Sequence, residues 1–443
     1  MRKNIFKTLA IAFFIAFSFG KIKAGDDCTV MRTIPYLQMP TQNSMVVRWV
    51  TSLDCQGVVE YGTDSAKVAK GTATKVNGAA TKTLIHRIKL NNLTPGTKYY
   101  YRVCSKFPPC NSQSTGSQHY SDVYSFTTLK DSNTNFTMLI FNDLHPYYFR
   151  EALDAFIPKI SPIIDTMKYD LLVFNGDCFD NFAKEEDIIH WLGIFSKFTK
   201  NNYIPSIYVA GNHEYDGAAA SLLKNYIEFV HDGISYGTMS LGDTQLLFLD
   251  TGFSGKNEVN YKYFNNGDTL NYAYFKEYRG KQKAYIKNLV EKSVFKNAAK
   301  RVLIHHIPFY GKLIDEVNPN DKDQNLGGRI NPYFEIGGEI LNNAHIDISI
   351  NAHIHYRQCI KEAGPYTQIG YPVYVCDGPD RCETDKYYQC YLPDNNSLVM
   401  TVLTKKNNNL FLKSYTLMYD ADGKISEIEE IQVSNDDLEL NKK

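Results

Sequence analysis

The sequence predicts a chain of two domains, an all-β sandwich followed by an α/β domain. Short runs of alternating polar and apolar residues, separated by turn residues, extend from about residue 29 to 129 and indicate antiparallel strands. After a polar linker at residues 130–135, apolar strands alternate with helical stretches, as in layered α/β domains. The chain has 443 residues, of which 43% are hydrophobic. This length suits roughly two to three domains with sizeable cores.

The first 24 residues have the layout of a secretory signal peptide. Residues 1–7 carry three basic side chains, residues 8–19 are nearly all apolar, and Ile22-Lys23-Ala24 is a tolerable cleavage site. The apolar run is shorter than the roughly 20 residues of a membrane-spanning helix. An uncleaved anchor is the alternative. We therefore expect residues 1–24 to be removed, and the mature chain to be secreted or periplasmic with no transmembrane segment.

Export would place the nine cysteines where disulfides persist. Four lie in the first third of the chain and four near its end: Cys28, Cys55, Cys104, Cys110, Cys359, Cys376, Cys382 and Cys390. Cys178 stands alone beside Asp177. Cys104 and Cys110 are close enough in sequence for a local bridge, as are Cys376 and Cys382. The alternative is that several remain buried thiols.

The charges balance, with 48 basic and 48 acidic residues and a formal net charge of +0. Nothing in this balance favours a nucleic acid as a stable partner or an acidic membrane surface. An anionic substrate would have to be attracted locally.

In the first domain, residues 25–130, strands are predicted at 45–50, 57–61, 86–90 and 99–103. The segment resembles a fibronectin type III-like sandwich, and in particular the N-terminal module of purple acid phosphatases. Trp-Val-Thr at 49–51, Glu-Tyr-Gly at 60–62 and Leu-Thr-Pro-Gly-Thr-Lys-Tyr-Tyr-Tyr at 93–101 carry this resemblance. Such sandwiches also occur in adhesion proteins, so the module alone implies no activity.

The second domain, residues 131–443, alternates strands and helices. Strands are predicted at 136–141, 170–174, 206–209, 245–249, 301–304 and 346–350, and helices at 150–167, 185–200 and 282–292. The long segments 252–280 and 311–332 have weak periodicity and could form either the walls of a substrate cleft or surface and oligomer contacts. Residues 398–403 and 410–417 read as a hairpin, and residues 427–443 are expected to fray.

Five polar stretches directly follow predicted strands. They are Asp143-Leu144-His145, Asn175-Gly176-Asp177, Gly211-Asn212-His213-Glu214, His305-His306-Ile307-Pro308 and Asn351-Ala352-His353-Ile354-His355. Ligand sites of α/β sheets form at this edge. Asp, His and Asn are donors for Zn, Fe and Mn, and two cations about 3.5 to 4 Å apart need a shared anionic bridge. Asp177 is the natural bridge.

With these five stretches in order, residues 136 to about 418 resemble the metallophosphoesterase, or calcineurin-like phosphoesterase, superfamily. The resemblance implies a layered α/β/β/α domain with a dinuclear centre. It implies that one metal is held by Asp143, His145, Asp177 and His355, and the other by Asp177, Asn212, His306 and His353. His213 would lie near the phosphate and either stabilise the transition state or protonate the leaving oxygen.

Three positions depart from the family patterns. Ala352 replaces a usual glycine, and His305 precedes His306, although the His-x-Pro spacing with Pro308 selects His306 as the ligand. Purple acid phosphatases have Asp-x-Gly in the first stretch and an iron-binding tyrosine three residues after the bridging aspartate. This chain has His145 and Asp180 there. We therefore expect a protein that is not purple, with Fe, Zn or Mn as candidate metals.

These features predict an exported phosphoesterase in which a metal-bound hydroxide attacks the phosphorus of a small phosphate ester. A phosphatase is our first interpretation, and a phosphodiesterase of the same superfamily is the alternative. A surface binding protein that uses the sandwich domain is a rival from a different class. It would be marked by lost ligands, and none is missing.

Overall fold

The computed structural model of the chain describes residues 30–72, 75–78, 81–109, 115–130, 135–146, 150–179, 182–230, 234–252, 263–265, 268–270, 272–310, 332–354, 358–360, 370–376, 396–419 and 425–433. The expected signal peptide lies outside these ranges, as do Asp180 and His355. Within them, no helix is long and apolar enough to cross a membrane.

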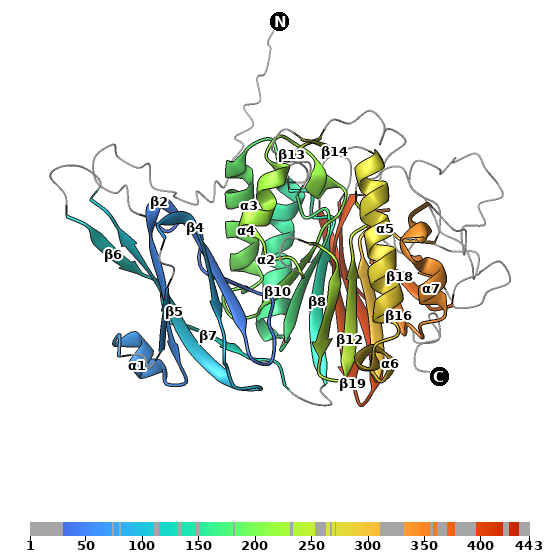
Figure 1. Cartoon of the computed structure of the whole chain (residues 1–443), viewed down its shortest axis with the longest axis horizontal. Helices are drawn as coiled ribbons and strands as arrows, with labels where there is room; N and C mark the ends of the chain where they lie inside the picture. Colours follow the sequence, from blue (N-terminus) through green and yellow to red (C-terminus); the bar gives the residue numbers. More distant parts are fainter. Residues whose placement is uncertain are drawn as a thin grey trace, which may run out of the picture.

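The N-terminal domain is rich in β-strands, as predicted (Figure 1). Its elements are β1 (Tyr36–Gln38), β2 (Met45–Gly62), α1 (Ser65–Ala69), β3 (Lys75–Gly78), β4 (Thr83–Leu90), β5 (Lys98–Phe107), β6 (Ser117–Tyr120) and β7 (Tyr124–Thr127). The two strands predicted at 45–50 and 57–61 are one strand, β2. Its first half pairs with β1 and β4 and its second half with β3 and β5, and the register shifts between Val50 and Cys55. The alternation of polar and apolar residues is interrupted at this irregularity, so the sequence predicted two strands where the structure has one.

Two sheets form the centre of the second domain. The first contains the parallel strands β8 (Phe136–Asn142), β9 (Leu171–Asn175) and β10 (Ser206–Val209), extended by the antiparallel strands β19 (Asn396–Lys406), β20 (Asn409–Tyr419) and β21 (Ile425–Val433). The second has the order β11 (Gly237–Leu241), β12 (Thr244–Leu249), β15 (Lys300–His305), β16 (Ile348–Asn351), β18 (Val373–Val375) and β17 (Gln358–Ile360). The strands from β12 to β18 in this order are parallel.

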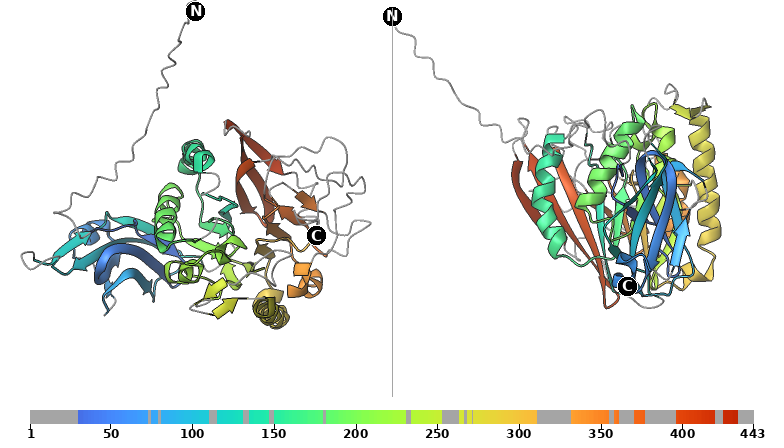
Figure 2. Two further views of the ribbon diagram at one scale, coloured as in Figure 1. Left: turned by 90° about the horizontal axis from the view of Figure 1, so that it is seen from above. Right: turned by 90° about the vertical axis from the view of Figure 1, so that its left-hand side faces the viewer.

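Helices cover the outer faces of both sheets (Figure 2). On the first sheet lie α2 (Arg150–Thr166) and α3 (Glu185–Phe198), and on the second α5 (Tyr272–Leu289) and α7 (Gly338–Asn342). Along β8, Met138 and Ile140 face the second sheet, whereas Leu139 and Phe141 face the helices. Burial on both faces explains why the strands are apolar throughout. The predicted α/β/β/α layering is confirmed.

Smaller elements complete the domain. They are η1 (His213–Tyr215), η2 (Ala220–Leu222), α4 (Leu223–Tyr226), β13 (Tyr263–Asn265), β14 (Asp268–Leu270), α6 (Ser293–Lys296) and η4 (Pro332–Ile336). One expectation was wrong here, since residues 427–433 pair with β20 instead of fraying. The segment 252–280, whose periodicity is weak, contains the β13–β14 hairpin and the first half of α5. The charged sequence of β21 does not predict a strand, and the hydrogen bonds to β20 stabilise it as one.

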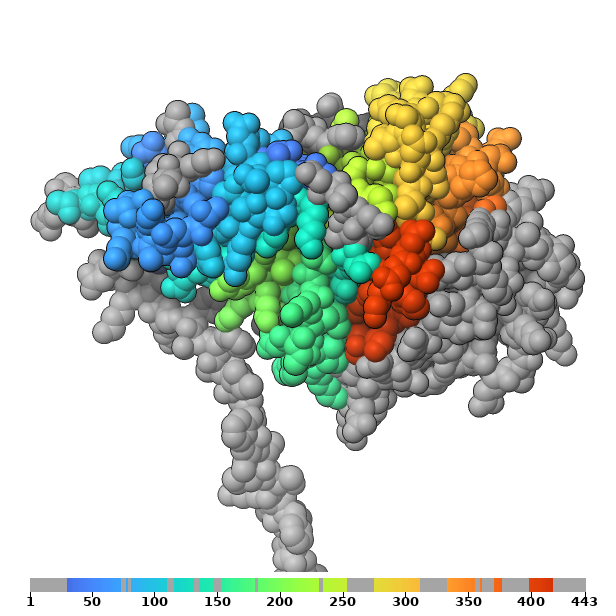
Figure 3. All heavy atoms as spheres, turned by 90° about the horizontal axis from the view of Figure 1, so that it is seen from below, coloured from blue at the N-terminus to red at the C-terminus, as the bar shows by residue number. Residues whose placement is uncertain are grey.

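The two domains share one sheet. Strand β1 pairs in parallel with β10, so the N-terminal strands extend the first sheet to 13 strands. The Tyr101 hydroxyl also donates to the Asn202 carbonyl at 2.8 Å, and the Tyr36 hydroxyl to the Tyr226 carbonyl at 2.7 Å. Seen from below, the surface of the N-terminal domain meets that of the second domain without a break (Figure 3).

The cysteines of the first domain do not support the expected local bridge. Cys55 and Cys104 are buried free thiols, and Cys110 lies outside the described residues. Cys178 is a third buried thiol and packs beneath the Asp177 turn. The alternative expectation, buried thiols, describes these three residues.

Candidate metal centre

The polar stretches that follow β8, β9, β10, β15 and β16 meet at the carboxyl ends of the two sheets. One Asp177 oxygen, Oδ2, lies 3.0 Å from His306 Nε2 and 3.8 Å from His145 Nε2. One Asp143 oxygen, Oδ1, lies 3.8 Å from each of the same two nitrogens. Two carboxylates and two imidazoles from both sheets are thus gathered around one small volume.

The backbone at this edge is strained. Asp143, His145, Asp177 and His353 have φ angles of 47°, 37°, 47° and 76°. Residues other than glycine rarely adopt this left-handed region, and such strain is concentrated at functional sites. The loops hold one another in place, since Asp143 N donates to Gly176 O at 3.1 Å and His145 N to Asp177 O at 3.3 Å.

Asp177 is the hub of the cluster. Its Oδ1 accepts a hydrogen bond from His213 N at 2.9 Å, which leaves Oδ2 facing the imidazoles. Burial would raise the pKa of the Asp177 carboxyl, but the imidazoles of His306, His213 and His145 hold this pKa well below its usual value. Asp177 is therefore an anion at neutral pH.

His306 is oriented toward the cluster by the main chain. Its Nδ1 donates to Asn175 O at 2.9 Å, so Nε2 points at Asp177. Burial lowers the pKa of His306, but the carboxylates of Asp177 and Asp143 outweigh it and raise the pKa to about 9. In the absence of cations, a proton thus occupies the position that a cation would take.

His305 lies outside the cluster. Its Nδ1 donates to Ile307 O at 2.8 Å, its Nε2 is 3.3 Å from Ser349 Oγ, and its ring stacks on Phe309 at a centroid distance of 4.1 Å. Burial lowers the pKa of His305 to about 3, so the ring is neutral. Of the two adjacent histidines, only His306 contributes a nitrogen to the site.

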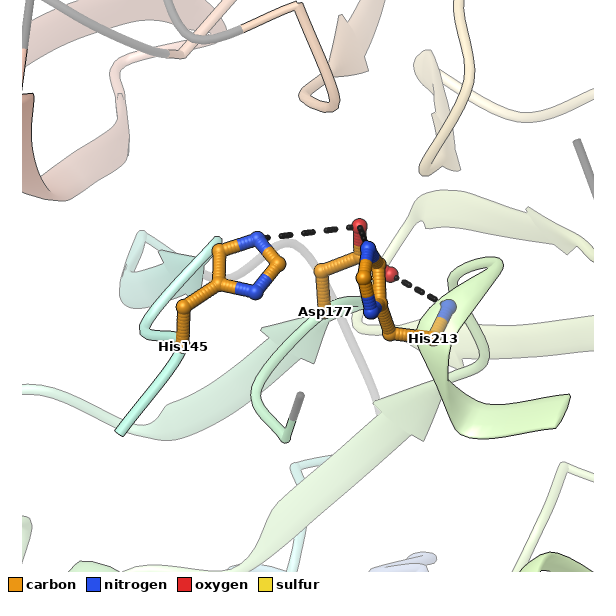
Figure 4. A group of neighbouring side chains, drawn as sticks. All are labelled: His145, Asp177 and His213. Atoms are coloured by element: carbon orange, nitrogen blue, oxygen red, sulfur yellow. Dashed lines mark hydrogen bonds and ion pairs between the residues drawn. The ribbon is translucent and has the colours of Figure 1, made fainter. Parts of the chain in front are cut away.

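The histidines and Asp177 form two candidate ligand groups. One consists of Asp177, His306 and His353, and the other of Asp177, His145 and His213 (Figure 4), and within each group the ligand atoms lie within 4.8 Å of one another. The grouping of Asp177 with His306 and His353 matches the predicted second metal. His213 stands in the other group, although it was predicted to contact phosphate. His355, predicted for the first metal, lies outside the described residues.

Asn212 and Asp143 are predicted ligands that belong to neither of these two groups. The Asn212 side-chain oxygen Oδ1 is buried and accepts no hydrogen bond from the described residues. Such an atom suits a cation ligand, because an unsatisfied buried acceptor is costly. The Asp143 carboxylate oxygen Oδ2 accepts hydrogen bonds from Asn142 Nδ2 at 2.7 Å and from His353 N at 3.1 Å.

Glu214 is an important residue whose role the sequence does not predict. Its buried carboxylate accepts hydrogen bonds from Asp177 N at 2.9 Å, Gly211 N at 2.7 Å, Cys178 N at 3.1 Å and the Tyr208 hydroxyl at 2.6 Å. It therefore ties the Asp177 turn to the Asn212 turn. A glutamate among apolar and metal-ligating residues was the only signal in the sequence.

Two family profiles match the chain. Residues 33–128 match the purple acid phosphatase N-terminal domain, and residues 136–357 match the calcineurin-like phosphoesterases. Acid phosphatase type 7 of Danio rerio is 27% identical over 211 residues, which cover 42% of this chain and 43% of that protein. The chain thus aligns with less than half the length of this curated relative.

Two solved structures share the fold. The purple acid phosphatase PPD1 from yellow lupin (Lupinus luteus) seeds has a TM-score of 0.56 at 13% identity and covers 91% of this chain and 74% of its own. PhoD has a TM-score of 0.57 at 13% identity, with coverages of 91% and 92%. The second profile match, residues 136–357, spans half of the sequence. On this evidence the chain belongs to the calcineurin-like phosphoesterase family.

Proposed function

We propose that the protein is an exported phosphatase that hydrolyses small phosphate esters at a centre of two cations. The observation that carries this proposal is the position of the Asp177 carboxylate. It lies between two groups of imidazole nitrogens at the carboxyl ends of the two sheets. Family membership supports metal-dependent hydrolysis of a phosphoester, and two of the three named relatives are acid phosphatases. A phosphodiesterase is the alternative.

The residues present fit two cations. The donors are nitrogens and oxygens without a cysteine, which suits Zn, Fe or Mn. We assign Asp143, His145, Asp177 and His355 to one cation, and Asp177, Asn212, His306 and His353 to the other. The unsatisfied Asn212 Oδ1 and the fixed orientation of His306 support the second assignment. When bound, such a pair lowers the pKa of water and offsets the charge of a phosphate.

His213 has the placement expected of an acid that serves the leaving group. Its side chain is 30% exposed, whereas those of Asp143, Asp177 and His306 are at most 2% exposed. Its backbone N–H is held by Asp177, and its Nε2 lies 4.0 Å from Asp177 Oδ2. We propose that His213 Nε2 donates a proton to the leaving oxygen, which needs a side chain that the substrate can reach.

Export rests on the N-terminal sequence. The signal peptide at residues 1–24 is a proposal supported by its charge and apolar pattern. N-terminal sequencing of protein recovered from the cell exterior or periplasm should begin near residue 25. Recovery only from the cytoplasm with Met1 intact would contradict export, and leave the catalytic proposal standing.

The catalytic proposal is tested by comparing wild type with Asp177→Asn. Elemental analysis should find about two metal ions per wild-type chain, and hydrolysis of a chromogenic monoester should exceed that of its diester. Because the amide is a poor bridge between cations, Asp177→Asn should lose metal and at least about 100-fold in kcat/KM.

The exposed Asp165→Asn, which removes a surface pair with Lys200, is the matched control and should retain both properties. Full metal content and full turnover in Asp177→Asn would contradict the proposal. A wild type that binds metal and hydrolyses neither ester would favour a binding protein. The Asp180 position further predicts a protein that is not purple, and an absorption spectrum checks this.

A further inference from the structure

A sixth strand of the second domain, β12, is also followed by a polar residue, and this residue belongs to neither ligand group. Asp250 directly follows β12 and is fully buried. Its main chain is pinned to α5, since Asp250 N donates to Gln282 Oε1 at 3.0 Å and Gln282 Nε2 donates to Asp250 O at 2.6 Å. The main chain that carries the Asp250 carboxylate is therefore fixed in position.

Three hydroxyls and one amide converge on this carboxylate. The Oδ1 atom accepts from Gly252 N at 2.8 Å, and Oδ2 accepts from the Tyr278 hydroxyl at 3.0 Å and from the hydroxyls of Tyr215 and Ser235. Hydrogen bonds to an ionised acceptor are about twice as strong as neutral ones. A buried carboxylate with this many donors holds its partners in one arrangement.

Tyr215 is the partner that leads to the candidate metal centre. It is the last residue of η1, the three-residue turn that begins with His213. The other end of this turn is tied to the cluster, because His213 N donates to Asp177 Oδ1 at 2.9 Å. Hydrogen bonds thus hold both ends of the turn. Asp250 binds one end from the second sheet, and Asp177 binds the other from the first sheet.

The orientation of the His213 side chain depends on these two hydrogen bonds. It is 30% exposed, and its ring meets His145 edge-on at a centroid distance of 4.8 Å. A partly exposed imidazole cannot be positioned by core packing alone. Its direction is set largely by the turn that carries it.

We propose that Asp250 is a positioning residue that acts through the Tyr215 hydroxyl to hold His213 in place for the proton transfer assigned to it. This inference rests on the proposed function. It predicts that loss of the Asp250–Tyr215 hydrogen bond impairs the proton transfer and leaves the metals bound.

The test compares Asp250→Asn, Tyr215→Phe and the double variant with wild type on aryl phosphates and alkyl phosphates. Good leaving groups need little protonation, so aryl phosphates with acidic phenols should lose less than about threefold in kcat. Alkyl phosphates should lose about 10- to 100-fold, because small displacements of a catalytic group have such effects. On alkyl phosphates the double variant should lose no more than the worse single variant, because both changes disrupt the same Asp250–Tyr215 hydrogen bond.

Tyr169→Phe is the matched control. It also removes a buried tyrosine hydroxyl, here one that donates to Thr199 O at 3.0 Å, and should keep wild-type rates on both substrate classes. Equal losses on both classes, lost metal, or additive losses in the double variant would overturn the inference. If Asp250→Asn fails to fold, Tyr215→Phe decides alone by the ratio of the two rates.

Hydrogen–deuterium exchange gives a readout without turnover. The His213 amide, which donates to Asp177, should exchange faster in Tyr215→Phe than in wild type, while amides of β9 stay protected. Unchanged exchange at His213 would count against the inference even if wild type hydrolyses no ester. Failure of the wild type on all esters would count only against the proposed function.

Discussion

Gly211 and Gly176 allow the strand-end loops to approach each other. A Cβ atom at Gly211 would stand 2.3 Å from Asp177 Oδ1 and 2.6 Å from Asp177 N. At Gly176, where φ is +80°, it would stand 2.5 Å from His306 Nδ1. Both contacts are with groups that hold the cluster together, so the absence of a side chain is what lets carboxylate and imidazole meet.

Gly211→Ala should displace the Asp177 turn and weaken metal binding by about 10- to 100-fold, with a parallel loss of hydrolysis. Calorimetric metal titration and steady-state rates measure the two effects. Gly280→Ala is the control, because a Cβ atom there meets nothing within 4 Å in the middle of α5. It should stabilise the chain by about 0.5 to 1 kcal/mol. Undiminished metal affinity in Gly211→Ala would contradict the close approach.

His86 is a buried histidine of the N-terminal domain. Its ring stacks on Trp49 at a centroid distance of 4.4 Å, its Nε2 lies 3.1 Å from Thr51 Oγ1, and its Nδ1 has no hydrogen-bond partner among the described residues. Burial lowers the pKa of His86 to about 4. The ring is therefore neutral in the folded protein.

This pKa predicts a loss of stability in acid. The unfolded chain, whose His86 has an ordinary pKa near 6.5, binds the proton first, so stability is fully present above about pH 6.5 and falls as the pH drops toward 4. The contribution is on the order of 3 kcal/mol. Urea unfolding from pH 4 to 7 should show a flatter profile for His86→Gln than for wild type. The exposed His190→Gln should leave the profile unchanged, and equal slopes in all three proteins would refute the assignment.

At the scale of elements, a buried ion pair, joined by the exposed Arg87, links the N-terminal domain to the segment after α4. Glu228 pairs with Arg48 of β2, from its Oε2 at 2.8 Å, and also with Arg87 of β4. The Arg48 and Glu228 side chains are 4% and 9% exposed. Burial raises the pKa of Glu228, but the guanidinium groups of Arg87 and Arg48 lower it by more. The pKa of Glu228 therefore lies below its usual value.

Glu228→Gln should destabilise the protein by about 3 kcal/mol or more, because it leaves the buried Arg48 guanidinium without a counter-charge. Equilibrium unfolding in urea measures this cost. Glu186→Gln removes a second pair between the same two domains, with Arg32, but the Glu186 side chain is 60% exposed. Its cost should be about 0.5 kcal/mol or less. Similar values for the two variants would show that burial does not decide the strength of this joint.

The whole molecule is organised by the 13-stranded sheet that both domains share. The joint between β1 and β10 removes the exposed edge that β10 would otherwise present. Tyr36 and Val50 of the N-terminal domain also belong to the core formed by α2, α3 and the first sheet. We therefore expect the two domains to unfold together.

The two tryptophans of the chain report on one domain each. Trp49 is buried in the N-terminal domain, and Trp191 lies on α3 of the second domain. Thermal unfolding followed by fluorescence in Trp49→Phe and in Trp191→Phe should give midpoints that track the circular dichroism curve of the same variant. A fluorescence midpoint well separated from that curve would show that the domains melt independently.

Strands β8, β9, β12, β15, β16 and β20 could be placed from the sequence to within one or two residues, and β10 at its observed bounds. The sequence did not predict the short strands β11, β13, β14, β17 and β18. Runs such as Leu171-Leu172-Val173-Phe174 are apolar because both faces of these strands are buried, and this signal is local. The same local reading failed for β2, whose two halves pair with different strands. It also failed for the start of α5 and for β21, where partners distant in sequence decide the structure.

The site divides in the same way. Seven candidate residues could be picked out from the sequence, because each follows an apolar strand and has a side chain that can bind a metal. They are Asp143, His145, Asp177, Asn212, His213, His306 and His353. Glu214 and Asp250 received no role, since their carboxylates act on backbone and hydroxyl groups that lie near them only in the folded chain.

The sequence by itself thus determined the layered fold and the edge of the sheet that carries the metal donors, because hydrophobic periodicity and strand ends are properties of neighbouring residues. Tertiary structure alone decided how β1 and β10 join the two domains and how Asp250 reaches the His213 turn. Those features depend on hydrogen bonds and packing between segments far apart in the chain.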